Sequence, residues 1–487
     1  MAIIDLFVNR NLELSDLNLL LEKKTASLVV VHGRRRIGKS RLIFEFARGK
    51  KMYVFSGVLP RKDTTAQIQR DEFSRQLSEQ LKISRLKGED WGDLFYTLAQ
   101  ATRKNKVIIL FDEISWIGSK DLEFLGKLKN AWDIYFKNNP HLILILCGSV
   151  SSWIDKNIIN SSAFMGRISL TILLKELSID YCNQLLTRLG FTGTEYEKFK
   201  LLAVTGGVPR YLEEIQPRLS ADENIRRLCF KPNGVLVKEF DDIFNDLFSA
   251  KAKTYKKIIY ALIPTPLEYQ QISDKIGIGK GSYLTGLLED LIKSGFIQRY
   301  YNWDLQTAKV SKSSHYRLSD NYLRFYLKNI EPNLNKIQNG HFTDYALGLM
   351  PGWDAIMGYQ FETLVLNNRT FIYQQLGLKP EEICCDNPYV QRATSRQEGC
   401  QIDYLIQTRF NTLFACEIKF SRNLIQAQVI DETKSKIQKL TLPKKFACFP
   451  VLIHVNGVSD RIVDSNYFVK VIDFGRALTS RKQVQLS

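Results

Sequence analysis

The sequence has 487 residues, which exceeds one compact hydrophobic core and indicates roughly two to four domains. With 45% hydrophobic and 24% charged residues, the composition is that of a folded globular protein and excludes disordered and collagen-like chains. Lysine and arginine outnumber aspartate and glutamate by 68 to 51. This net charge of +17 is compatible with a polyanionic partner but does not require one.

Membrane-spanning and zinc-binding patterns are absent from the sequence. It holds no run of about eighteen apolar residues, so we expect no transmembrane helix. The N-terminal segment lacks the pattern of a signal peptide. The eight cysteines form no C-x-x-C pair and the five histidines are scattered, so neither a zinc site nor a disulfide framework is expected. These patterns predict a cytoplasmic protein that does not enter a membrane.

Short apolar runs alternate with helical stretches in the first third of the chain. The four β-like runs span residues 27–32, 51–57, 106–111 and 141–147. Strands separated by helices form βαβ units, so we predict an α/β fold around a parallel sheet. Beyond about residue 150 the pattern becomes helical, and the chain from about residue 353 again mixes helical and β-like segments.

The strongest motif lies between the first β-like run and the helix that follows it. The segment "HGRRRIGKS" matches the spacing G-x-x-x-x-G-K-[ST]. Glycines let backbone N–H groups curl around phosphate oxygens at a helix N-terminus, while the lysine reaches the β- and γ-phosphates and the serine ligates Mg²⁺. We therefore predict an ATP site in the loop, with these residues: Gly33, Arg34, Arg35, Arg36, Ile37, Gly38, Lys39, Ser40 and Arg41. For the three consecutive arginines we prefer a solvent-facing position to a role in steering the triphosphate.

Two further β-like runs end in polar residues that suit nucleotide hydrolysis. The run "VIILFDEISW" ends in Asp112, which would hold Mg²⁺ through water, and Glu113, which would orient and polarise the attacking water. Ser149, at the end of "LILILCGSV", either touches the γ-phosphate or the attacking water or simply caps a turn. Metal ligation by Ser40 and Asp112 and catalysis by Glu113 are the expected roles.

Several segments together resemble the archaeal-type P-loop ATPases, relatives of the AAA+ and STAND ATPases. They are the P-loop and "DE" motifs and the segments "FVNRNLELSDL" (7–17), "GSV", "MGR" (165–167) and "TGGVPRYL" (205–212). "YRLSDNYLRFYL" (316–327) and "GYQFETL" (358–364) resemble a C-terminal region that often accompanies this ATPase and is similar to PD-(D/E)xK nucleases. The resemblance covers nearly the whole chain. It implies an ATPase core at 1–170, a helical lid at 171–250, a winged-helix domain at 251–335 and a restriction-endonuclease-like α/β domain at 336–487.

The resemblance also implies roles for three arginines. Arg10 would lie near the adenine, and Arg167 is a candidate arginine finger, in cis or toward a neighbouring subunit. Arg210 is the candidate sensor arginine, because Pro209 at a helix start fixes φ and lets the arginine point at phosphate. The alternative is that Arg210 makes a surface ion pair.

Residues 252–318 are expected to form a winged helix, with three helices followed by two strands that make the wing. The exposed positions of the third helix are Lys280, Ser282, Tyr283 and Thr285, a thin set for reading DNA bases. Such a module either contacts DNA or mediates contacts between domains.

The segment "IDYLIQTRFNTLFACEIKFS" (402–421) reads as a β-hairpin interrupted by charges. A turn centred on Phe410 places Asp403 opposite Glu417, and Lys419 shares their face because side chains alternate with period two. Two such close carboxylates repel each other unless a divalent cation or a proton lies between them. The spacing D-x13-E-x-K matches a metal-ion nuclease signature, in which Asp403 and Glu417 hold Mg²⁺ and Lys419 stabilises charge. Glu362, on an upstream helix, matches the additional acidic metal ligand of such folds.

The alternative for the hairpin is a charged face that is solvated or paired as a structural salt bridge. The downstream lysines of "KSKIQKLTLPKK" also have two interpretations: they follow a phosphate backbone, or they form one solvated helix face. They are Lys434, Lys436, Lys439, Lys444 and Lys445. The sequence thus predicts an ATP-hydrolysing P-loop ATPase whose nucleotide state controls a DNA nuclease-like domain. The competing hypothesis is an ATP-dependent switch or scaffold that binds DNA, a protein partner or a second copy of itself and cleaves nothing.

Overall fold

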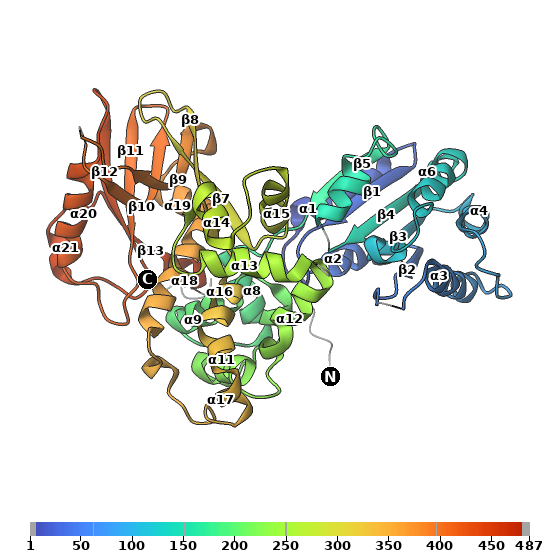
Figure 1. Ribbon diagram of the computed structural model, residues 1–487, viewed down its shortest axis with the longest axis horizontal. Coiled ribbons are helices and arrows are strands. Elements are labelled where there is room, and N and C mark those ends of the chain that lie inside the picture. The colour runs from blue at the N-terminus through green and yellow to red at the C-terminus, as the bar shows by residue number, and fades with distance from the viewer. Residues whose placement is uncertain (1–5, 62, 150, 249–250, 396, 480–487) are drawn as a thin grey trace. The chain divides into compact units, whose positions relative to one another are not determined.

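The computed structural model describes residues 6–61, 63–149, 151–248, 251–395 and 397–479. The chain divides into two compact units, one formed by Phe7–Lys175 and the other beginning at Glu176 (Figure 1). Val150 of the "GSV" motif and residues 249–250, where a domain boundary was expected, lie outside the described residues. Within those ranges, no helix is both long enough and apolar enough to cross a membrane.

The first unit is built on a five-stranded parallel sheet. Its order is β2-β3-β4-β1-β5. The strands are β1 (Ser27–His32), β2 (Met52–Ser56), β3 (Val107–Asp112), β4 (Leu142–Gly148) and β5 (Ile168–Leu173). Four of them coincide with the predicted β-like runs, because strands buried on both faces are read as continuous apolar segments. The predicted α/β fold with a parallel sheet is confirmed.

Helices cover both faces of this sheet. One face packs against α1 (Asn11–Leu19) and α2 (Lys39–Phe46). The other face packs against α3 (Ala66–Leu81), α4 (Trp91–Thr102) and α6 (Phe124–Ile134), through a cluster of stacked and edge-on aromatic rings that are fully buried. The short helices α5 (Ile114–Ile117) and α7 (Ser151–Ile154) follow β3 and β4 directly. The helices packed on both faces fix the positions of the carboxyl ends of the strands, where the predicted site lies.

Strand β5 corrects the predicted end of the first domain. The expected boundary at residue 170 falls inside β5, which pairs with β1 from Leu28↔Ile168 to His32↔Leu173. The first unit therefore extends to Lys175. β5 is not predicted from the sequence, because Ser169 and Thr171 interrupt its apolar residues. Such polar residues are tolerated there because β5 is an edge strand.

The second unit starts with helices and continues into a small antiparallel sheet. The first helices are α8 (Ile179–Leu189), α9 (Glu195–Thr205), α10 (Pro209–Leu212), α11 (Ala221–Cys229) and α12 (Val235–Phe248). Then follow α13 (Ala252–Leu262), β6 (Leu267–Glu268), α14 (Tyr269–Ile276), α15 (Ser282–Lys293), β7 (Ile297–Trp303) and β8 (Val310–Leu318), with strand order β6-β8-β7. The three helices and two long strands predicted from the sequence are present. Their identity as a winged helix stays a prediction.

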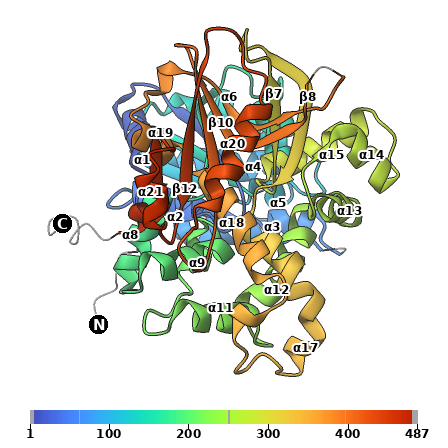
Figure 2. The ribbon, with the colours of Figure 1, turned by 90° about the vertical axis from the view of Figure 1, so that its left-hand side faces the viewer.

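The last part of the second unit is a mixed five-stranded sheet of order β13-β12-β11-β10-β9. Before it come α16 (Asn321–Phe325), α17 (Leu334–Gln338), α18 (Trp353–Asn367) and α19 (Arg369–Leu376). The remaining elements are β9 (Ile383–Gln391), β10 (Cys400–Thr408), β11 (Thr412–Ile418), α20 (Gln428–Lys439), β12 (Ala447–His454), α21 (Asp460–Asp464) and β13 (Lys470–Asp473). β9, β10 and β11 are antiparallel, whereas β11, β12 and β13 are parallel. Helix α20 packs across β10 and β12 (Figure 2).

Candidate functional site

The loop between β1 and α2 needs its glycines. Gly33 has a φ of 143°, and a Cβ atom there would lie 2.4 Å from the backbone oxygen of Leu174. Gly38, directly before α2, has a φ of 89°. Side chains at these positions would meet backbone atoms or adopt a left-handed conformation that L-residues avoid. The loop therefore turns tightly just before the N-terminus of α2. A glycine-rich turn at a helix N-terminus is the arrangement in which backbone N–H groups bind an anion.

Lys39 is buried inside this loop, and its ammonium faces oxygen atoms. The Lys39 Nζ donates to the backbone oxygens of Gly33 and Arg34, at 3.2 and 3.1 Å, and to Ser149 Oγ at 2.9 Å. Ser149 Oγ in turn donates to Glu113 Oε1 at 2.9 Å, and the Ser149 backbone N–H donates to Glu113 Oε2 at 3.3 Å. A continuous hydrogen-bonded path thus joins the loop lysine to the predicted water-polarising carboxylate. Ser149 is a link in this path rather than a turn cap alone.

Ser40 and Asp112 meet beside the same loop. The Ser40 hydroxyl donates to Asp112 Oδ2 at 2.8 Å. A hydroxyl and a carboxylate from the ends of neighbouring elements are hard oxygen donors of the kind that Mg²⁺ prefers, so these residues fit the ion. Glu113 follows Asp112 with a φ of 51°, a left-handed conformation that costs a residue with a side chain about 1–2 kcal/mol. Such a conformation at a site edge aims the Glu113 carboxylate toward Ser149 instead of along β3.

The arginines of the loop do not share one environment. Arg34 is 4% exposed, Arg35 and Arg36 are half-buried, and Arg41 on the first turn of α2 is exposed. The prediction that the three consecutive arginines face solvent is therefore wrong for Arg34. Arg36 has a φ of 68°, which reverses the chain within the loop, so neighbouring side chains point in different directions.

Arg10 lies against the loop from outside. Its guanidinium donates to the backbone oxygen of Ile37 at 3.3 Å and to that of Lys175 at 2.7 Å, and it pairs with Glu13. The side chain is buried and connects the P-loop to the segment that leaves β5. The position of Arg10 near the adenine stays a prediction. Its observed hydrogen bonds stabilise the backbone of the loop.

Arg167 lies directly before β5 and pairs with α6. Its Nε and Nη2 atoms contact Asp133 Oδ1 and Oδ2 at 2.9 and 2.8 Å, and Lys129 contacts the same carboxylate at 3.0 Å. The Arg167 guanidinium holds the pKa of Asp133 well below its ordinary value. The arginine is thus held in one orientation with its charge partly exposed to solvent.

The register of β5 separates Arg167 from the loop of its own chain. Because β1 and β5 run parallel, Ile168 pairs with Leu28 at one end of the sheet, while the loop follows His32 at the other end. Successive residues of a strand are about 3.3 Å apart, so the two ends are roughly 15 Å apart. Of the two predicted roles for Arg167, action in cis does not fit this geometry.

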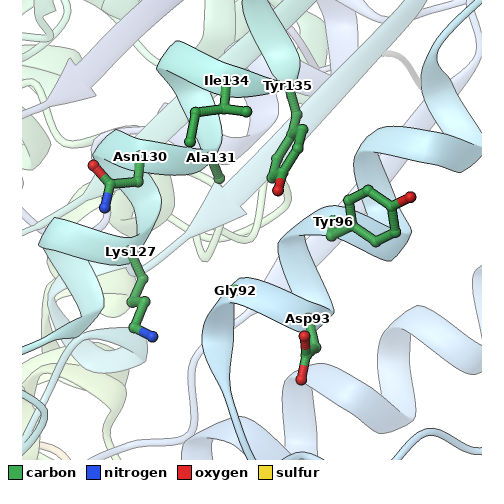
Figure 3. A pocket seen from close by; sticks show the side chains of 8 residues that line it. All are labelled: Gly92, Asp93, Tyr96, Lys127, Asn130, Ala131, Ile134 and Tyr135. Atoms are coloured by element: carbon green, nitrogen blue, oxygen red, sulfur yellow. The ribbon is translucent and has the colours of Figure 1, made fainter.

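A cavity of about 380 Å³ opens between α4 and α6 on the outer side of the first unit (Figure 3). Tyr96 and Tyr135 meet edge to face in it, with ring centres 5.2 Å apart. Lys127 and Asp93 supply the charged part of the lining. None of the P-loop residues lines this cavity, so it is separate from the predicted nucleotide site.

Arg210 is the second residue of the short helix α10, which begins at Pro209 as predicted. Its guanidinium pairs with Glu213 at 3.6 Å and with Glu214 at 2.6 Å, and its side chain is 48% exposed. These are the surface ion pairs that the alternative interpretation expected. The role of Arg210 as a sensor of phosphate stays a prediction.

In the second unit, the hairpin of β10 and β11 has the predicted register. Tyr404 pairs with Cys416 and Gln407 with Leu413, which centres the turn on Phe410. Asp403 and Glu417 are therefore neighbours across the two strands, and the backbone N–H of Ile418 donates to Asp403 Oδ2 at 3.0 Å. Burial and the negative charge of Glu417 raise the pKa of Asp403 to about 6.

The positive charge between these carboxylates comes from a lysine on helix α20. Lys436 Nζ lies 2.6 Å from Glu417 Oε2 and 3.4 Å from Asp403 Oδ1. Lys419 Nζ lies 3.2 Å from Glu417 Oε1 and 2.7 Å from Glu432 Oε2. We call these five residues (Asp403, Glu417, Lys419, Glu432 and Lys436) the carboxylate–lysine cluster. Burial opposes the charged form of Lys436, but the two hairpin carboxylates raise its pKa, so the ammonium stays charged at neutral pH.

The predicted third metal ligand is engaged elsewhere. Glu362 on α18 pairs with the buried Arg317 of β8 at 2.5 Å. In the part of the chain that the structure describes, no three His, Cys, Asp or Glu side chains are grouped to hold a metal ion. As arranged, the cluster fits an ammonium between Asp403 and Glu417 and does not fit a divalent cation. The expectation that only a divalent cation or a proton relieves the repulsion of the carboxylates is corrected, because Lys436 supplies the charge.

The sequence held one signal for this arrangement. Glu432 and Lys436 are four residues apart, so they lie on one face of α20. From the sequence, Lys436 is one of several downstream lysines, because nothing local shows which strands the helix covers. Arg317 gave no signal beyond its place in "YRLSD".

Comparison with known proteins agrees with the geometry of the first unit. Residues 7–215 match the ATPase domain predominantly from Archaea. The chain is 27% identical over 359 residues to "Uncharacterized protein MJECL04" of Methanocaldococcus jannaschii, covering 73% of this chain and 76% of that protein. Among solved structures, the Walker-type ATPase PABY2304 of Pyrococcus abyssi is similar with a TM-score of 0.49 and 20% identity, covering 66% of this chain and 96% of that one. Cdc6p from Pyrobaculum aerophilum is similar with a TM-score of 0.35 and 13% identity, covering 70% of this chain and 97% of that one.

The parallel sheet and the glycine-dependent loop are typical of the P-loop class of ATPases. More particularly, residues 7–215 are similar to the ATPase domain found predominantly in Archaea. The match ends before α11, and the carboxylate–lysine cluster lies outside it.

Proposed function

We propose that the protein binds ATP with Mg²⁺ and hydrolyses it at the P-loop. The observation that carries this proposal is the path Lys39–Ser149–Glu113 beside the Ser40–Asp112 contact. Without nucleotide, the Lys39 ammonium donates to loop oxygens and to Ser149. When ATP binds, this ammonium would instead contact the β- and γ-phosphates. Ser40 and Asp112 would hold Mg²⁺, which when bound neutralises phosphate charge.

Glu113 is the residue that we assign to the attacking water. Its carboxylate accepts hydrogen bonds from the side chain and the backbone of Ser149. Ser149 therefore holds Glu113 in one orientation and also contacts the lysine that binds phosphate. An oriented carboxylate next to the γ-phosphate position polarises a water molecule for in-line attack.

A second copy of the chain would complete this site with Arg167. The arginine lies at the end of the sheet away from its own P-loop and is held by Asp133, so its guanidinium is presented in a fixed direction. An arginine supplied by a neighbouring subunit stabilises the charge that develops during phosphoryl transfer.

Phosphate release by the purified full chain tests both parts of this proposal. With ATP and Mg²⁺, the rate per chain should rise with protein concentration, and Arg167→Ala should retain ATP binding while its rate falls by about 100-fold or more. Lys129→Ala, which leaves the Arg167–Asp133 pair in place, is the matched control and should keep the wild-type rate. Absence of phosphate release would remove the ATPase proposal, whereas a rate per chain that is independent of concentration would remove only the role of a second copy.

For the second unit, we propose a nuclease-type fold whose state is controlled by the nucleotide. The hairpin register supports this proposal, since Asp403, Glu417 and Lys419 come together at the spacing D-x13-E-x-K. DNA is the substrate that such a set of side chains would act on. The competing function is an ATP-dependent switch or scaffold that binds DNA or a protein without cleavage. It is supported by the ion pairs that Lys436 makes with both carboxylates.

Incubation with plasmid and linear DNA separates these two functions. For a nuclease, we expect cleavage that requires Mg²⁺ or Mn²⁺ and is lost in Asp403→Asn and in Lys419→Ala. The control is Lys445→Ala, a substitution in the loop after α20 that leaves the cluster intact, and it should cleave like the wild type. Intact DNA under every combination of ATP and divalent metal would favour the switch. Cleavage that persists in Asp403→Asn would show that the hairpin is not the site.

A further inference from the structure

A cavity of about 370 Å³ lies in the second unit, beside helix α17. All of its lining residues come from one segment of the chain, 328–351, so it is separate from the carboxylate–lysine cluster. Figure 2 shows α17 at the end of this unit that lies away from β10 and β12. The volume is within the range of small-molecule sites, which is about 300–1,000 Å³.

Pro332 explains why the helix beside this cavity is irregular. In an α-helix the N–H of residue 332 would bond to the carbonyl of Lys328, but proline has no N–H and its ring clashes with that carbonyl. The chain instead widens into a π-helical turn over Tyr326–Ile330, in which the Glu331 N–H donates to the Tyr326 oxygen. Such turns are rare and are found frequently at functional sites. Lys328 lies on this turn and lines the cavity.

Another part of the lining forms where the chain reverses after α17. Gly340 has a φ of 72°, a left-handed conformation that glycine adopts easily. The reversal brings His341 back to α17, where its backbone N–H donates to the Lys336 oxygen at 3.0 Å. Phe342 is 5% exposed and packs against Phe230, with ring centres 4.9 Å apart. The apolar part of the lining is therefore held in place by the core.

The charge of this cavity is positive. Lys328, Lys336 and His341 line it and are exposed, and none of its lining residues is acidic. Among the described residues, neither lysine has an ion-pair partner. The cavity between α4 and α6 differs, because its Lys127 pairs with Asp90 at 2.8 Å. Two unpaired ammonium groups at one cavity favour an anionic ligand such as a phosphate ester.

Aromatic and amide groups supply the rest of the lining. Tyr345 is half-buried, and its ring meets the Phe342 ring edge to face with centres 5.3 Å apart. Asn333 Nδ2 donates to the backbone oxygen of Asn329 at 2.9 Å, which leaves Asn333 Oδ1 as an acceptor. Aromatic rings stack on nucleic-acid bases, and asparagine side chains bond to base edges. The ligand that suits this lining carries both a phosphate and an aromatic base.

We propose that this cavity binds a nucleotide unit, at a site separate from the P-loop. Lys328 and Lys336 pair with its phosphate, and its base stacks on Tyr345. Asn333 contacts the edge of the base. Bases in a duplex are already paired and stacked, so the unit is either a free nucleotide or an unpaired nucleotide of a single strand. This site requires neither ATP hydrolysis nor DNA cleavage.

Binding of a fluorescently labelled, single-stranded oligothymidylate to the full-length protein tests the proposal. Anisotropy is measured without ATP and with EDTA, so failure here is distinct from failure of either proposed hydrolytic function. One variant combines Lys328→Ala with Lys336→Ala, and the other is Tyr345→Leu. Tyr345→Phe keeps the ring. The control for net charge combines Lys104→Ala with Lys106→Ala, which removes two exposed lysines between α4 and β3.

We expect the Lys328/Lys336 double variant to bind the oligonucleotide at least about tenfold more weakly than the wild type, because charge-assisted contacts with phosphate are lost. Its melting temperature should not change, since both lysines are exposed and unpaired. Tyr345→Leu should weaken binding by about tenfold, the usual effect of losing one stacked base, and Tyr345→Phe should restore it. The Lys104/Lys106 control should bind like the wild type.

Wild-type affinity in the Lys328/Lys336 double variant, or in a folded Tyr345→Leu protein, would overturn the proposal. So would an equal loss in the Lys104/Lys106 control. Inorganic polyphosphate that displaces the probe as well as unlabelled oligothymidylate does would also overturn it, because the site would then not detect a base. Displacement by thymidine monophosphate would support the site as one for a free nucleotide. Displacement by the oligonucleotide alone would support it as one for a single strand.

Discussion

Lys39→Ala is expected to lower the affinity for ATP by about 100-fold or more, since each charge-assisted hydrogen bond lost to phosphate costs about 1.5–3 kcal/mol. The Lys39 ammonium is buried in the loop and faces only oxygen atoms: the backbone oxygens of Gly33 and Arg34 and the hydroxyl of Ser149. No other ammonium is observed to contact these atoms among the described residues. The measurement is a titration with ATP and Mg²⁺, read by calorimetry or by a fluorescent ATP analogue.

Lys50→Ala is the matched control for this change. Lys50 lies just beyond the other end of α2, where its ammonium contacts the backbone oxygen of Phe46. This variant should bind ATP like the wild type. Melting curves without nucleotide would show that Lys39→Ala is folded. Unchanged ATP affinity in a folded Lys39→Ala protein would contradict the assignment of the loop.

Glu113→Gln is expected to keep ATP binding and to slow hydrolysis by about 100-fold or more, the usual effect of losing a general base. The amide oxygen of glutamine still accepts one of the two hydrogen bonds that Ser149 donates to Glu113, so the side chain remains linked to Ser149. The charge that polarises water is removed. ATP should therefore remain bound and intact, which single-turnover assays with radiolabelled ATP would show.

The control for Glu113→Gln is Glu123→Gln, an exposed carboxylate directly before α6 in the same domain. It should hydrolyse ATP at the wild-type rate. If Glu113→Gln hydrolysed ATP at the wild-type rate, a residue other than Glu113 would have to act as the base. Loss of ATP binding in this variant would instead indicate that the Glu113 charge supports the loop through Ser149.

Much of the first unit could be predicted because its signals are local. Buried parallel strands are continuous apolar runs, so β1 to β4 were found within about one residue of their observed ends. The glycines of the loop reflect φ values that only glycine adopts easily, and this requirement is visible in one short segment. β5 was missed because its edge position leaves polar side chains in the run.

The loop arginines show where local reasoning stops. Arg34, Arg35 and Arg36 look alike in the sequence, but the chain reverses at Arg36, and Arg34 becomes buried while its neighbours stay half-exposed. Likewise, the segment "MGR" does not reveal at which end of the sheet Arg167 lies. The pairing of β5 with β1 decides this, because both strands run in the same direction.

The sequence by itself determined the P-loop, the strands that carry it and the register of the Asp403–Glu417 hairpin. These features depend on backbone conformations and on the period-two alternation of neighbouring residues. Only the tertiary structure decided which cation faces the hairpin carboxylates. Lys436 comes from a helix that packs across β10 and β12, and the contact joins residues that are 19 and 33 positions apart. Such contacts follow from the packing of whole elements, which no short segment encodes.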